Sequence, residues 1–198
     1  MGFRSLRVIN DDRIAPGGGF GTHGHREMEI VTYVIDGPLE HRDSLGTGTE
    51  IQRGDVQRMS AGMGIRHSEM NPSPTEPAHL LQIWLLPGRT GLRPSYEQRN
   101  FPDAEKRGRL RLVASGDGRD DSVTVHHDVD LFATVLTGRE QVTHSLRVGQ
   151  GAWVQVLHGD VKLNEHQMAT GDGAAVTAEP RLVLTGIELA EVLLFDLA

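Results

Sequence analysis

The 198-residue chain has a net charge of -7 at neutral pH, 37% hydrophobic residues and no cysteine. This length suits one large domain or two of about 100 residues, each with its own core. The negative charge argues against direct binding of nucleic acid or of an anionic membrane. The lack of cysteine excludes disulfides, thiolate nucleophiles and cysteine-based zinc sites. Neither a secretory leader nor a long apolar run is found, so we expect a cytoplasmic protein.

Short β-strands separated by turn residues follow one another through the first half of the chain. β-branched residues in the absence of a helical stripe predict strands over 4–10, 28–36, 39–43, 56–59 and 79–86. Between the first two, Pro16 and the glycines up to Gly21 form a pliable loop that lets the backbone turn sharply and a ligand approach closely. Turn signals spaced by about 8 to 12 residues favour a β-sandwich or β-barrel.

A charged, proline-containing stretch over residues 89–108 separates this half from a second series of strands. We therefore predict a first barrel over residues 1–88, a linker over 89–108 and a second barrel over 109–198. The turn at Gly159-Asp160 echoes Gly54-Asp55 and indicates a repeat of one β-barrel unit. No long amphipathic helix is expected, so the predicted class is all-β.

Two pairs of side chains in the first half have the spacing of metal ligands. His23 with His25, and His67 with Glu69, are separated by two positions and share one face of a strand. If the two strands face each other inside a barrel, three imidazoles and one carboxylate converge. Such nitrogen and oxygen ligands suit iron(II), manganese, cobalt, nickel, copper or zinc, and an open coordination position would admit substrate or O₂. The second half lacks such a quartet.

The pattern around these pairs resembles the two metal motifs of the cupin superfamily. The first motif is represented by Gly21, His23, His25 and Glu29, and the second by Gly54, Asp55, His67 and Asn71. More narrowly, the chain resembles pirin over residues 6–12, 28–34, 40–44 and 60–69, whereas the second half is similar chiefly in its layout. The resemblance implies two stacked cupin barrels, a bicupin, with one metal, usually iron, in the first barrel. By position, His23, His25, His67 and Glu69 would be its ligands.

Two further residues compete for a place at this metal. The usual cupin pattern makes the carboxylate at Glu29 a ligand, but it lies about 13 Å beyond His25 along a straight strand. We therefore expect Glu29 to support the site, by orienting an imidazole, and Glu69 to be the ligand. His41, beside Arg42 and Asp43, is interpreted as a surface or hydrogen-bonded residue. The remaining histidines are expected to be structural or solvated, namely His79, His126, His127, His144, His158 and His166.

Pirins generally carry a further stretch before the segment that matches Gly2, Phe3 and Arg4. The resemblance therefore implies that the strands contributed by that stretch are missing here. We expect such a difference to affect protection of a sheet edge and closure of the pocket.

The resemblance implies a metal-dependent dioxygenase. Bacterial pirins are linked to quercetin 2,3-dioxygenase activity, in which O₂ opens a flavonol ring and carbon monoxide is released. In this hypothesis Fe(II) is the expected cofactor, and Glu69 is the catalytic group that accepts a proton from the substrate hydroxyl. The alternative is a non-catalytic, redox-sensitive iron protein that binds a protein partner, as associated with eukaryotic pirin. A third hypothesis is a structural cupin with a fully ligated ion.

Overall fold

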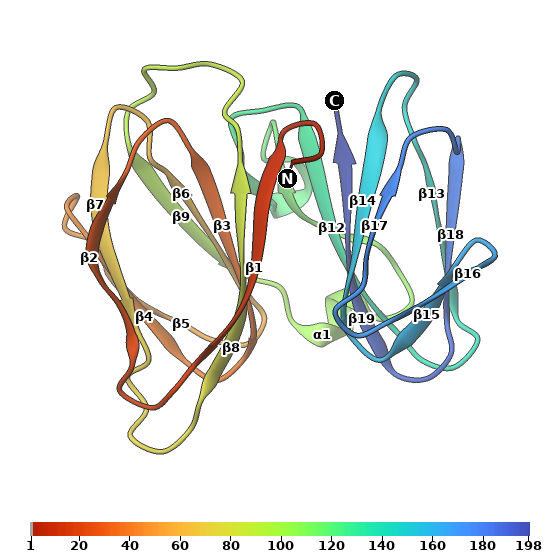
Figure 1. Cartoon of the computed structure of the whole chain (residues 1–198), viewed down its shortest axis with the longest axis horizontal. Coiled ribbons are helices and arrows are strands. Elements are labelled where there is room, and N and C mark those ends of the chain that lie inside the picture. The colour runs from red at the N-terminus through yellow and green to blue at the C-terminus, as the bar shows by residue number, and fades with distance from the viewer. Residues whose placement is uncertain (1) are drawn as a thin grey trace. The chain divides into compact units, whose positions relative to one another are not determined.

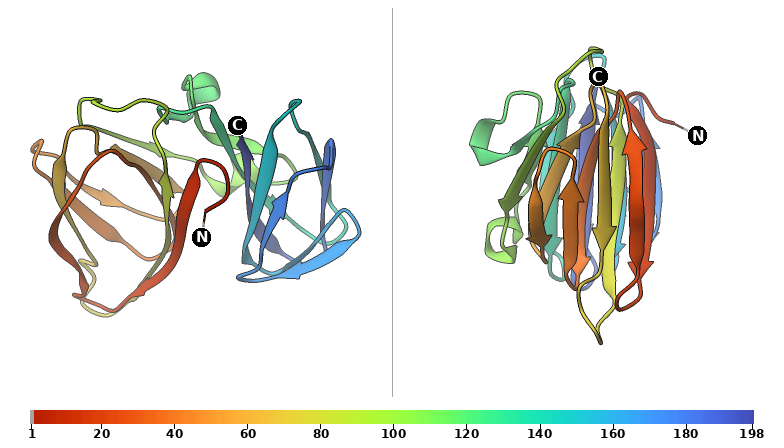
Figure 2. Two further views of the ribbon diagram at one scale, coloured as in Figure 1. Left: turned by 45° about the horizontal axis from the view of Figure 1, so that its top comes forward. Right: turned by 90° about the vertical axis from the view of Figure 1, so that its left-hand side faces the viewer.

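The computed structural model describes residues 2–198, which form two compact units built almost entirely of β-strands. The first unit comprises Met1–Asn100 and Val123–His127, and the second comprises Phe101–Ser122 and Asp128–Ala198. Within each unit two antiparallel sheets face each other as the layers of a flattened barrel (Figure 1, Figure 2). The predicted all-β class with two barrels is therefore confirmed.

The first unit contains a five-stranded sheet and a four-stranded sheet. Its strands are β1 (Leu6–Ile14), β2 (Gly19–His25), β3 (Glu29–Asp36), β4 (Leu39–Asp43), β5 (Gly48–Ile51), β6 (Asp55–Ser60), β7 (Ile65–Met70), β8 (Ala78–Leu85) and β9 (Ser95–Asn100). One sheet has the order β1-β8-β3-β6-β9 and the other the order β2-β7-β4-β5. The short strand β11 (Val123–Thr124) also belongs to this unit. Strand β1 is therefore at an edge of the first sheet.

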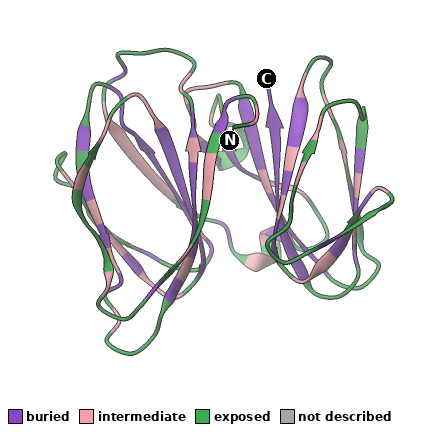
Figure 3. Cartoon of the chain, viewed as in Figure 1, coloured by how far each residue is buried: buried purple, intermediate pink, exposed green. Residues whose placement is uncertain are grey.

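The core of the first unit lies between these sheets, and alternation along the strands decides which side chains enter it. Strand β3 is central in its sheet, and all of its residues except the last are buried. Strand β7 alternates, so that Ile65, His67 and Glu69 are buried whereas Arg66 is exposed. Figure 3 shows the same contrast between buried central strands and exposed loops. The unit thus directs polar side chains of β7 into an otherwise apolar interior.

The second unit repeats the two-sheet design around an apolar interior. Its helices are α1 (Asp103–Lys106) and a short 3-10 turn (Arg119–Asp121), and its strands are β10 (Arg111–Ser115), β12 (Val129–Leu136), β13 (Gln141–Ser145), β14 (Gly151–His158), β15 (Asp160–Leu163), β16 (His166–Ala169), β17 (Gly173–Val176), β18 (Arg181–Gly186) and β19 (Ala190–Leu197). Within the unit the sheet orders are β10-β12-β19-β14-β17 and β13-β18-β15-β16. Among residues 2–198, the clusters of three or more potential metal ligands all lie in the first unit.

The segment predicted as a linker is more ordered than its composition indicated. Residues 95–100 form β9, which pairs with β6 along its whole length, from Asp55 opposite Asn100 to Ser60 opposite Ser95. Helix α1 occupies Asp103–Lys106 of the remainder. Alternating charged and polar side chains are typical of a strand at the edge of a sheet, where they discourage further pairing. The charges at Glu97 and Arg99 therefore mark an edge strand, and reading them as a linker was wrong.

No helix within residues 2–198 is both long enough and apolar enough to cross a membrane.

Candidate metal centre

Strands β2 and β7 bring the two predicted ligand pairs face to face. Their register places His23 opposite His67 and His25 opposite Ile65, whereas Phe20 is opposite Glu69. A bulge between Phe20 and His23 shifts the register, so the two pairs do not align residue for residue. His67 therefore lies directly across from the first pair, and Glu69 lies farther along the strands.

The imidazoles of His23, His25 and His67 form a compact cluster, which we call the histidine trio. Their ring centroids are 4.7 Å (His23 to His25), 4.5 Å (His23 to His67) and 5.0 Å (His25 to His67) apart. The Nε2 atoms of His23 and His67 are separated by 3.1 Å. One ring nitrogen of each residue lies within 4.8 Å of those of the other two. This arrangement lets three nitrogens share one ion.

The polar atoms of the histidine trio fit a metal. His23 Nδ1 lies 2.8 Å from the Gly21 carbonyl, which can only accept a hydrogen bond, so Nδ1 carries the proton and Nε2 presents its lone pair. His25 Nε2 is buried without a hydrogen-bond partner among the described residues. Burial, and then the charge of His23, lower the pKa of His25. Burial lowers the pKa of His67 to about 3, with smaller effects of His23 and His25. Both rings are therefore neutral at pH 7, as metal ligands must be.

Glu69 is brought near His67 but not into the histidine trio. Its carboxyl is fully buried, and Oε2 accepts a 2.6 Å hydrogen bond from the Gln82 side chain. It clusters instead with His41 and His67, with one potential ligand atom of each within 4.8 Å of the others. Burial raises the pKa of Glu69 to about 7, against the hydrogen bonds from Gln57, Thr32 and Gln82. Glu69 as a fourth ligand therefore stays a prediction.

The buried Glu69 carboxyl leads to a specific pH dependence of the metal-free protein. In the unfolded chain it ionises near its ordinary pKa of 4.5, whereas in the folded chain it keeps its proton up to about pH 7. Between these values the folded state binds the additional proton, so rising pH lowers the unfolding free energy. We expect the Glu69→Gln protein to exceed the wild type in stability by about 3 kcal/mol at pH 8 and by much less at pH 4.

Urea denaturation of both chelator-treated proteins at the two pH values measures this difference. The control is Glu165→Gln, because Glu165 is exposed in the second unit. This variant should match the wild type at both pH values. A Glu69→Gln protein that gains no stability between pH 4 and pH 8 would show that the carboxyl is ionised in the folded state.

His41 is the residue that the sequence interpretation undervalued. The sequence predicted either a surface residue or a hydrogen-bonded one. His41 is hydrogen-bonded, with Nε2 3.1 Å from Asp43 Oδ2. It is not a surface residue, because it is fully buried and its ring centroid lies 5.3 Å from that of His67. Burial lowers its pKa, although the Asp43 carboxylate opposes the shift. The alternation of Leu39, His41 and Asp43 on one face of β4 was the signal that could have placed it inside.

Glu29 orients an imidazole, but not one of the histidine trio. Its Oε2 accepts hydrogen bonds from the Ser60 hydroxyl (2.9 Å) and from the backbone N–H of His126 (3.1 Å). The His126 ring is held by the same oxygen, 3.1 Å from Nδ1. Glu29 therefore orients His126, a residue that lies far along the sequence from both predicted ligand pairs.

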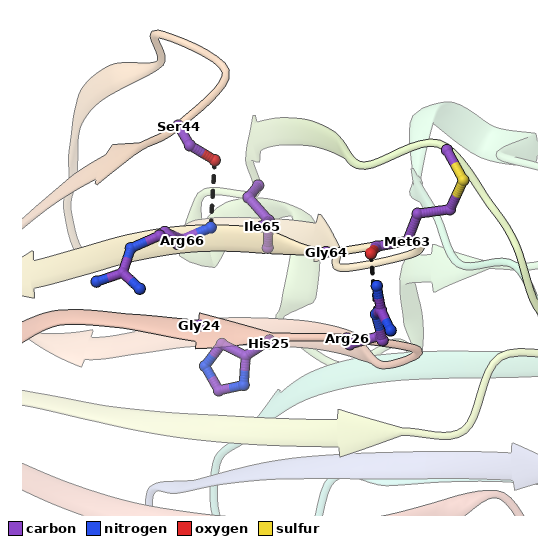
Figure 4. Close-up of a pocket in the computed structure, with 8 residues that line it drawn as sticks. All are labelled: Gly24, His25, Arg26, Ser44, Met63, Gly64, Ile65 and Arg66. Atoms are coloured by element: carbon purple, nitrogen blue, oxygen red, sulfur yellow. Dashed lines mark hydrogen bonds between the residues drawn. The ribbon is translucent and has the colours of Figure 1, made fainter.

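A pocket of about 390 Å³ opens beside one member of the histidine trio. Figure 4 shows its lining, to which β2 contributes His25 and β7 contributes Arg66. Two hydrogen bonds drawn there hold its wall, from Arg26 Nε to the Met63 carbonyl (3.0 Å) and from the Arg66 backbone N–H to the Ser44 hydroxyl (3.2 Å). The pocket gives a small molecule access to the edge of the trio.

Comparison with known proteins adds the family context. The family model described as Pirin matches residues 1–85, and the one described as Quercetinase C-terminal cupin domain matches residues 112–197. A quercetin 2,3-dioxygenase of Escherichia coli is 47% identical over all of this chain and 84% of its own length. A pirin-like protein of Caulobacter vibrioides is 38% identical over all of this chain and 85% of its own. The crystal structure of the Escherichia coli pirin YhhW in complex with nickel(II) superposes with a TM-score of 0.94 at 48% identity, covering all of this chain and 84% of YhhW.

Proposed function

Because the chain belongs to the pirin family of cupin proteins, we propose that it is a metal-dependent dioxygenase that opens the ring of a flavonol such as quercetin. The observation that carries the proposal is the convergence of three imidazoles next to a buried carboxyl and a pocket. The 47% identity to a quercetin 2,3-dioxygenase supports the choice of substrate class. In this reaction both atoms of O₂ enter the product and one ring carbon leaves as carbon monoxide.

We assign one divalent transition metal to His23, His25 and His67, with Glu69 as the fourth ligand. The unpartnered Nε2 of His25 and the facing Nε2 atoms of His23 and His67 support the three nitrogen ligands. The cluster that Glu69 forms with His67 supports the fourth. The nickel(II) complex of the related pirin supports a divalent ion. We propose iron(II) as the native metal. These ligands also accept several neighbouring ions, and cellular supply decides among them.

The side chains divide the work of the proposed reaction. When bound, the metal would supply Lewis acidity for an ionised hydroxyl and electrons for O₂ chemistry. The histidine trio fixes the position of the ion. Glu69 accepts the proton that the substrate hydroxyl loses, which requires its carboxylate to leave the ion or to share it. The pocket beside His25 holds the flat aromatic substrate against the trio. Gln82, which donates to Glu69, keeps the carboxyl oriented.

Oxygen uptake in the presence of quercetin tests this proposal. Protein reconstituted with iron(II) under anaerobic conditions should consume O₂ and bleach the flavonol absorbance, whereas chelator-treated protein should do neither. Glu69→Gln should lower kcat by at least about 100-fold, the usual loss when a proton acceptor is removed. Glu165→Gln, which changes an exposed carboxylate of the second unit, should leave kcat unchanged.

The other outcomes separate the alternatives. Tight metal binding without O₂ uptake would overturn the dioxygenase proposal and favour the metal-dependent sensor with a protein partner. Equal uptake with and without metal would remove the metal from the reaction altogether. The cytoplasmic location expected from the sequence stays a prediction, and fractionation of the host cell tests it.

A further inference from the structure

A second pocket of the first unit lies outside the histidine trio. It has a volume of about 520 Å³ and is lined mainly by the loop between β8 and β9, together with His126. The loop crosses the upper rim of the first unit in Figure 1, in yellow-green. None of His23, His25, His67 and Glu69 lines this pocket. Any ligand bound there would therefore contact a different set of side chains from those of the proposed metal centre.

The loop that forms the pocket is held in place by its backbone. The Gly88 N–H donates to the His126 carbonyl (2.7 Å), and the Met63 N–H donates to the Leu92 carbonyl (2.9 Å). The Gly91 N–H donates to the Glu27 carboxylate (3.1 Å). The pocket is thus preformed, and a ligand would not have to order the loop on binding.

Two arginines that line the pocket have no acidic partner among the described residues. Arg89 and Arg93 are exposed, and neither guanidinium forms an ion pair or hydrogen bond within that part of the chain. The His126 Nδ1 donates to the buried Glu29 carboxylate, which fixes the ring as part of the pocket wall. Two guanidiniums that line one pocket can bind the same external anion, because their forked donors match its oxygens.

The acidic groups near the pocket are already engaged. Glu27 accepts the Gly91 N–H, and Glu29 is buried against His126 and Ser60. Glu97 accepts from Arg58 Nη2 (3.1 Å) and from the Thr124 N–H (2.9 Å). Glu27 contacts the loop backbone at Gly91, and its single charge reduces but does not cancel that of the two arginines.

We propose that this pocket, with Arg89 and Arg93, binds the phosphate group of a small phosphorylated molecule. A phosphate monoester carries close to two negative charges and three acceptor oxygens, which match two guanidinium forks. The volume of about 520 Å³ exceeds that of phosphate alone and leaves room for an attached small organic group. The net charge of -7 makes a nucleic-acid backbone an unsuitable source of the phosphate.

Calorimetric titration of the metal-loaded full chain with inorganic phosphate tests the proposal, at fixed pH and low salt. We expect binding in the millimolar range that becomes at least tenfold weaker in the Arg89→Gln/Arg93→Gln protein. The matched control is Arg7→Gln, because Arg7 is an exposed arginine of β1 at the other edge of the sheet from β9. It should bind phosphate like the wild type.

Four results would overturn the proposal. They are no phosphate binding by the wild type, equal weakening in the Arg7→Gln protein, tighter binding of citrate than of phosphate, and loss of binding in His67→Ala with retention in the double arginine variant. The last result would place the anion at the histidine trio. Because phosphate binding is measured without quercetin or O₂ uptake, the outcome is independent of whether the dioxygenase proposal holds.

Discussion

The His67→Ala protein is expected to fold but to lose its metal and its O₂ uptake. His67 belongs to both ligand clusters, and its Nε2 faces that of His23 at 3.1 Å. Its removal leaves His23 and His25 with Glu69 as the remaining proposed ligand, and Glu69 clusters with His41 and His67 instead of with those two imidazoles. Losing even a residue that only supports a metal ligand weakens binding by about 10- to 100-fold, so loss of a ligand should exceed about 100-fold. Metal content after dialysis against a weak chelator, measured by mass spectrometry, checks the result.

The matched control for this experiment is His166→Ala. His166 is exposed on β16 of the second unit, so its loss should change neither metal content nor O₂ uptake. Circular dichroism of both variants establishes that the β-structure is retained. A folded His67→Ala protein with the full complement of metal would remove His67 from the proposed ligand set and, with it, the assignment of the site.

The Gly19→Ala protein is expected to lose both stability and metal affinity. A Cβ at this position would lie 2.2 Å from the Glu69 carbonyl oxygen and 2.7 Å from Met70 Cα, too close for any side chain. Gly19 is opposite Met70 in the pairing of β2 with β7, so the clash must push apart the strands that carry the histidine trio. We expect a loss of about 2 to 4 kcal/mol in unfolding free energy, since backbone atoms cannot move aside as a flexible side chain can.

Gly21→Ala provides a control in the same glycine-rich stretch of β2. A Cβ on Gly21 would meet nothing within 4 Å, so this substitution should change stability by less than about 0.5 kcal/mol. Urea denaturation of the two variants, followed by metal titration, separates the effects. Equal stabilities of the Gly19→Ala and Gly21→Ala proteins would mean that β2 and β7 do not approach as closely as described.

The contrast between these two glycines shows what composition leaves undecided. The run of glycines predicted a sharp turn and the close approach of a ligand, whereas the structure places another backbone against Gly19, at Glu69 and Met70. Nothing in the sequence distinguishes Gly19 from Gly21, because the neighbour that requires glycine lies about 50 residues away along the chain.

His126 makes the same point for a histidine. The sequence interpretation treated it as structural or solvated because His126 and the adjacent His127 would point to opposite faces of a strand and could not easily chelate together. Its partner is Glu29, 97 residues earlier in the chain, and the pocket that it lines is completed by the loop between β8 and β9. Such a contact follows from how the strands pair and has no local signature.

The sequence by itself determined the all-β class, the two-barrel organisation and the two pairs of candidate ligands. These features depend on local rules, namely β-branched strands, turn residues and the alternation of side chains on a strand. Only the tertiary structure decided that His25 and His67 meet His23, that Glu69 turns to Gln82 and clusters with His41, and that β9 is an edge strand. The physical reason is strand register. The bulge in β2 and the pairing of β4 with β7 set which buried side chains face each other. The spacing of residues along one strand predicts neither the bulge nor the pairing.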